Sequence, residues 1–134
     1  MESILPFFEF LVIILLAFVF ARYMFDLGVD GVSYSDAVKI LQDEDSSLLL
    51  DVRTKKEFAT GHPPGAVNIP VQELKNRLDL LMPHKDKRII VICASGMRSR
   101  MALRLLRKAG FPAVKNFQGG MSSWKGKVER PMAR

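Results

Sequence analysis

The stretch Ile-Ile-Val-Ile-Cys-Ala-Ser-Gly-Met-Arg-Ser, residues 89–99, decides the fold. Its first four residues are apolar on both faces, which is typical of a strand buried inside a parallel sheet. Gly96 then permits a tight loop, and the apolar side chains that follow recur at the spacing of an amphipathic helix. A strand that passes through a tight loop into a helix places backbone N–H groups where they can face an anion.

The chain beyond residue 32 alternates between helical and strand patterns. The predicted strands are residues 48–52, 67–69, 89–92 and 113–117, and the predicted helices are residues 33–41, 72–82, 98–109 and 121–124. Alternating elements with apolar strands predict an α/β fold in which helices cover both faces of a parallel sheet.

Cys93 is the only cysteine among the 134 residues, so the chain has no internal disulfide. With only two histidines beside it, a structural zinc site of four ligands is not expected. Loop amides, the helix dipole and Arg98 should all lower the pKa of the Cys93 thiol. The alternative is a buried cysteine that acts only as a small apolar side chain. Gly96, Arg98 and the helix start favour a reactive thiolate.

Three ordered motifs resemble the rhodanese family. Residues 93–99 fit its Cys-x-x-Gly-x-Arg-Ser loop, residues 51–70 resemble its Asp-Val-Arg…Gly-His-x-Pro-Gly-Ala signature, and residues 116–124 resemble its closing Gly-Gly…Trp element. The resemblance covers residues 32–131. It implies a rhodanese-like parallel five-stranded sheet flanked by helices, and a sulfurtransferase whose cysteine carries a persulfide without any metal or organic cofactor.

The resemblance also implies the site. Cys93 is the expected catalytic nucleophile, and the loop that should hold the donor and the persulfide anion comprises Ala94, Ser95, Gly96, Met97, Arg98 and Ser99. The supporting residues, expected to be architectural, are Asp51, Arg53, Glu57 and His62. Arg98 either neutralises the anionic donor or pairs with a carboxylate such as Asp51 or Glu57. Ala94 stands where many active relatives have arginine, so one anion contact is missing.

The N-terminus is a separate apolar segment. Between residues 4 and 25 only Glu9 and Arg22 are charged, and a helix over these residues would be roughly 33 Å long, close to the hydrocarbon core of a bilayer. We interpret residues 1–27 as an uncleaved transmembrane anchor, 28–32 as a short linker and 33–131 as the rhodanese domain. A cleaved signal peptide and a buried core helix are the alternatives. Basic residues follow the apolar segment and none precedes it, which predicts a cytoplasmic domain.

Charge and loop length limit the remaining functions. The net charge is +6, which suits small anions or an anionic membrane surface. Aromatic residues do not interleave with the basic ones, so nucleic acid is not an expected partner. The expected partners are a small anionic sulfur donor and an external thiol, cyanide or protein acceptor. Two alternatives stay open: a membrane-tethered adaptor without activity, and a cysteine-based phosphatase, which needs Cys-x5-Arg where Cys93 to Arg98 is Cys-x4-Arg.

Overall fold

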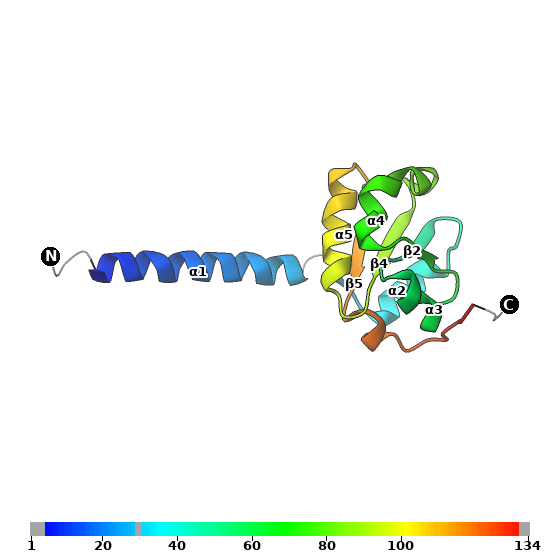
Figure 1. Cartoon of the computed structure of the whole chain (residues 1–134), viewed down its shortest axis with the longest axis horizontal. Coiled ribbons are helices and arrows are strands. Elements are labelled where there is room, and N and C mark those ends of the chain that lie inside the picture. The colour runs from blue at the N-terminus through cyan, green and yellow to red at the C-terminus, as the bar shows by residue number, and fades with distance from the viewer. Residues whose placement is uncertain (1–4, 29–30, 132–134) are drawn as a thin grey trace. The chain divides into compact units, whose positions relative to one another are not determined.

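The computed structural model describes residues 5–28 and 31–131, which fall into two compact units. The first unit contains a single helix, α1 (Leu5–Gly28). The second unit, from Gly31 onward, contains the sheet and all the other elements (Figure 1).

The second unit is built on one five-stranded sheet. Its strands are β1 (Gly31–Val32), β2 (Ser47–Asp51), β3 (Val67–Asn68), β4 (Arg88–Ile92) and β5 (Val114–Phe117). They lie in the order β1-β5-β4-β2-β3, and every pair is parallel. The predicted α/β fold with a parallel five-stranded sheet is confirmed.

Helices cover both faces of this sheet (Figure 1). The helices of the domain are α2 (Tyr34–Leu41), α3 (Lys55–Thr60), α4 (Val71–Leu74) and α5 (Met97–Lys108), with 3-10 turns η1 (Lys75–Leu80), η2 (Met82–His84) and η3 (Gly120–Ser123). One buried cluster joins α4 and α5 to the sheet through Leu74, Leu103 and Leu106. A second cluster, on the α2 side, contains Ala37 and Phe117. The strand β4 lies between the two clusters and is buried on both faces, so the position of its carboxyl end is fixed.

Several predicted boundaries were wrong. The predicted helix 72–82 is helical only to Leu74 and then continues as 3-10 turns, because Arg77 leaves helical geometry with φ −127° and ψ 24°. The looser path still buries both Leu74 and Leu81. The predicted helix 121–124 is the 3-10 turn Gly120–Ser123. Gly31 and Val32, assigned to the linker, form β1, while residues 29–30 lie outside the described part.

The helix α1 contains one segment, Pro6–Met24, that is long and apolar enough to cross a membrane by length and composition. Side chains from Pro6 to Met24 are exposed, as is typical of a membrane span and not of the alternative, a buried core helix.

Candidate active site

Cys93 follows β4 directly and is 1% exposed. The chain then turns through residues 94–95 to Gly96, which has a φ of +102° and caps the N-terminus of α5. This conformation brings the Gly96 N–H back toward Cys93, where it donates a hydrogen bond to Sγ over 2.9 Å. A side chain at residue 96 would strain this turn. The sulfur therefore lies inside the loop, at the carboxyl end of the sheet.

Hydrogen bonds favour the thiolate form of Cys93. Burial alone raises the pKa of its thiol. Hydrogen bonds from the Ser99 side chain and from the backbone of Ser99, Gly96 and Ser95 lower it by more, so the pKa of Cys93 is lowered overall. Ser99 Oγ lies 3.4 Å from Cys93 Sγ. The structure thus supplies the N–H donors that were expected to stabilise an anion in this loop.

A second segment, at residues 120–122, contacts the backbone of the Cys93 loop. The Met121 N–H donates to the Cys93 carbonyl oxygen over 2.8 Å, and the Ser122 N–H donates to the Ala94 carbonyl oxygen over 3.3 Å. Gly120 makes this approach possible, because a Cβ there would lie 2.5 Å from both of these carbonyl oxygens. The closing Gly-Gly motif is therefore part of the site and fixes the backbone of the nucleophile.

Arg98 is paired with Glu57 of α3. Its Nη1 and Nη2 donate to the two carboxylate oxygens over 2.6 and 2.8 Å. Hydrogen bonds from Arg98 and Thr54 hold the pKa of Glu57 at about 2. Of the two roles open to Arg98, the structure shows the pairing with a carboxylate, which ties α3 to the start of α5.

The Glu57–Arg98 pair makes the stability of the domain fall in acid. Its carboxyl has a folded pKa of about 2 against an ordinary 4.5, so the stabilisation is complete above about 4.5 and is lost as pH falls toward 2. Both side chains are about one-third exposed, so solvent screening leaves about 1 kcal/mol. Urea unfolding should show Glu57→Gln less stable than wild type at about pH 6, with the difference shrinking at about pH 3. A difference independent of pH would contradict this assignment.

Asp51 and Arg53 form a buried ion pair at the end of β2. Their side chains are 0% and 7% exposed, and Arg53 Nη2 lies 2.7 Å from Asp51 Oδ2. Arg53 Nη2 also donates to the Gly61 carbonyl oxygen over 2.8 Å. His62 stacks on Phe58 with ring centroids 3.6 Å apart, and its Nδ1 lies 2.9 Å from the Phe58 carbonyl oxygen. These contacts hold the segment after β2 in place, and an architectural role for Asp51, Arg53 and His62 stays a prediction.

Comparison with known proteins now identifies the family. Residues 33–127 match the model of the rhodanese-like domain. The chain belongs to the rhodanese-like family. The resemblance drawn from the three motifs is confirmed.

Several relatives of this rhodanese-like chain are named as sulfurtransferases or sulfur carriers. YrkF of Bacillus subtilis, named as a candidate sulfur carrier protein, is 43% identical over 95 residues, which are 70% of this chain and 50% of YrkF. The chain thus spans about half the length of that relative. A rhodanese-like domain protein from Staphylococcus aureus is 27% identical with a TM-score of 0.68, over 78% of this chain and 100% of that one. The human single-domain sulfurtransferase TSTD1 is 29% identical with a TM-score of 0.63, over 75% and 100%.

Two residues of the rhodanese site were missed from the sequence. Asn116 of β5 is buried, and its Oδ1 accepts a hydrogen bond from the Ser99 hydroxyl over 2.5 Å. Thr54 caps α3 and shares a capping box with Glu57. The Thr-x-x-Glu spacing could have revealed α3. Asn116 begins the motif of residues 116–124, but nothing in the sequence indicates that its side chain meets Ser99.

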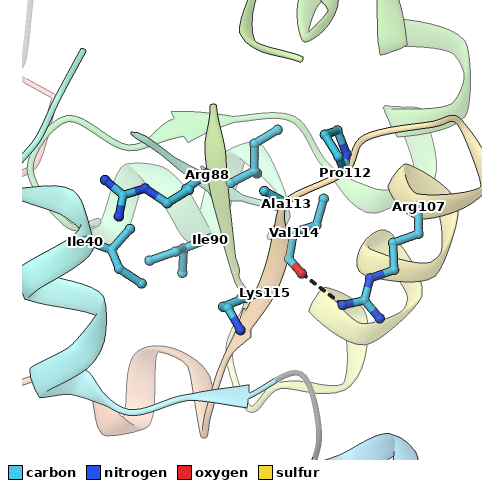
Figure 2. Close-up of a pocket in the computed structure, with 9 residues that line it drawn as sticks. Ile40, Arg88, Ile90, Arg107, Pro112, Ala113, Val114 and Lys115 are labelled. Carbon is cyan, nitrogen blue, oxygen red and sulfur yellow. Dashed lines mark hydrogen bonds between the residues drawn. The ribbon is translucent and has the colours of Figure 1, made fainter. Parts of the chain in front are cut away.

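A separate cavity of about 260 Å³ lies at the amino ends of β4 and β5 (Figure 2). Basic Arg88, Arg107 and Lys115 surround apolar Ile90 and Val114, and Arg107 Nη2 donates to the Val114 carbonyl oxygen over 3.1 Å. Cys93 lies at the opposite, carboxyl end of β4, so this cavity is not part of the rhodanese loop. Within residues 5–28 and 31–131, no group of three His, Cys, Asp or Glu side chains could hold a metal ion.

Proposed function

We propose that the chain is a membrane-anchored sulfurtransferase that carries sulfane sulfur on Cys93. The donor is a small anion such as thiosulfate, and the acceptor is an external thiol, cyanide or a protein. The observation that carries this proposal is the buried Cys93 Sγ, which accepts the Gly96 N–H over 2.9 Å inside a loop that lowers its pKa. The sulfurtransferase named among the relatives supports it.

Sulfur transfer takes two balanced steps. The Cys93 thiolate attacks the outer sulfur of thiosulfate, the S–S bond of the donor breaks, and sulfite leaves with the electron pair. The product is Cys93–S–S⁻, whose charge the loop N–H groups stabilise. Cyanide then attacks the outer sulfur and leaves as thiocyanate, which returns Cys93 to the thiolate. Because Cys93 is the only thiol of the chain, the acceptor in the second step is external.

The geometry favours sulfur transfer over the two alternatives. A phosphatase loop must surround a tetrahedral phosphoryl group, whereas the six-residue loop from Cys93 to Arg98 closes its Gly96 N–H directly on Sγ. An adaptor without activity would not need a thiol stabilised as an anion. Ala94 cannot supply the anion contact that an arginine would make, so it should lower the affinity for the donor without changing the reactivity of Cys93.

The test is to measure the mass of the purified chain before and after incubation with a sulfur donor. After incubation with thiosulfate, intact-mass spectrometry should find one added sulfur atom per chain, and cyanide should remove it as thiocyanate in a single burst. A chain that gains no sulfur from thiosulfate or from a small persulfide would support the adaptor alternative.

The membrane anchor is a proposal of its own, supported by the exposed apolar segment Pro6–Met24. The chain should remain with membranes after a carbonate wash, while a variant that begins at Gly31 should be soluble and folded. Protease added outside intact cells should leave the domain uncut, because the basic residues after the segment favour a cytoplasmic domain. A mature N-terminus near Arg22 would instead reveal a cleaved signal and an exported domain.

A further inference from the structure

The cations around the rhodanese loop differ in whether a carboxylate already neutralises them. Arg98 is held by Glu57 through two hydrogen bonds, and Arg53 is held by Asp51. Position 94, beside the nucleophile, carries no charge because it is alanine. The pairs leave little positive charge from Arg98 or Arg53 for an anionic donor.

Arg100 is the exception among the described residues near the loop. It lies in the first turns of α5, half-buried, and its Nε is buried without a hydrogen-bond partner. A Cβ placed on Gly96 would lie 4.0 Å from Arg100 Nη2, so the guanidinium borders the loop that holds Cys93. A buried donor without an acceptor is rare in proteins and calls for an explanation.

Two further donors border the same point. The Cβ position on Gly96 is 3.9 Å from Asn116 Nδ2 and 3.7 Å from the Gly119 backbone nitrogen. Asn116 Oδ1 lies 2.5 Å from Ser99 Oγ, so the donor Nδ2 is on the opposite side of the amide. Donors from α5, from β5 and from the Gly-Gly turn thus lie within 4.0 Å of the position that a Cβ at residue 96 would take.

We propose that Arg100, the Asn116 amide and the Gly119 N–H form an oxyanion subsite that binds the sulfonate group of an anionic sulfur donor beside Cys93. This inference rests on the proposed sulfur transfer. One charged and two neutral N–H donors match the oxygens of a sulfonate or of departing sulfite. The subsite supplies the positive charge that Ala94 does not. It makes Arg100 a specificity residue for donors that carry an oxyanion.

The first test compares two donors with cyanide as the acceptor. Thiosulfate carries a sulfonate group, and cysteine persulfide transfers the same sulfur without one. Arg100→Gln should raise the KM for thiosulfate roughly tenfold or more, since a charge-assisted hydrogen bond is lost, and should change kcat/KM for cysteine persulfide less than about twofold. Lys108→Gln is the matched control, because it removes one positive charge from an exposed position at the far end of the same helix. It should leave both donors unaffected.

The second test does not depend on turnover. Titration calorimetry should detect sulfite binding to Cys93→Ser, and adding Arg100→Gln should weaken that binding roughly tenfold.

Three outcomes would overturn the subsite. An unchanged KM for thiosulfate in Arg100→Gln would mean that the space holds only solvent, although sulfur transfer through Cys93 would stand. An equal loss with both donors would show that Arg100 only supports the fold of the loop. A chain that does not bind sulfite, or binds it equally well after Arg100→Gln, would refute the subsite whether or not it transfers sulfur. A chain that transfers no sulfur would refute the proposed function and is a separate result.

Discussion

Replacing Cys93 with serine is expected to abolish sulfur transfer, to below roughly a thousandth of the wild-type rate. The serine hydroxyl is nearly isosteric with the thiol, but it is a far poorer nucleophile and cannot hold a persulfide. The chain offers no second cysteine to replace it. Thiocyanate formation from thiosulfate and cyanide measures the loss directly, and intact-mass spectrometry should find no added sulfur on the variant.

The fold should survive this change. The Gly96 N–H and the Ser99 hydroxyl can both bond a serine oxygen, so the free energy of unfolding should shift by no more than about 1 kcal/mol. Cys93→Ala serves as a second inactive variant without a polar atom at the site. Transfer at the wild-type rate by either variant would show that another group carries the sulfur, and the mechanism would be wrong.

The position of Cys93 could be predicted because its determinants are adjacent in the sequence. An apolar strand, one cysteine, a glycine three residues later and a helical repeat all fall within residues 89–109. Each acts on local backbone geometry, so their order alone indicates a nucleophile at a helix N-terminus. The same reasoning explains why most of the β-α alternation after residue 33 was predicted, apart from α3 and the 3-10 turns.

Contacts between distant segments could not be predicted in the same way. Glu57 and Arg98 are 41 residues apart, and the sequence left open whether Arg98 would meet Glu57, Asp51 or the donor. Asn116 meets Ser99 only because β5 lies beside β4 in the sheet. The strand β1 has two residues, too few for any periodic pattern, and it exists because β5 offers a partner edge. The position of Cys93 was therefore predicted better than the residues that surround it.

The largest effect on stability is expected at Asp51, which no solvent reaches. Its carboxylate accepts hydrogen bonds from the Arg53 guanidinium over 2.7 Å and from the Arg53 backbone N–H over 3.0 Å. Asp51→Ala would leave the Arg53 charge buried without a counterion and should cost about 3–5 kcal/mol of unfolding free energy. For a small domain this is a large part of the total, so the variant should unfold at much lower urea.

Exposure decides the size of that loss, and a surface pair supplies the control. Lys55 Nζ lies 3.9 Å from Glu73 Oε1 with its side chain largely exposed, so Lys55→Ala should cost less than about 1 kcal/mol. The double variant Asp51→Leu with Arg53→Met removes both buried charges together and should recover part of the stability that Asp51→Ala loses. If Asp51→Ala and Lys55→Ala cost the same, the Asp51–Arg53 pair is solvated in solution and cannot be what holds Gly61 and the segment after β2 in place.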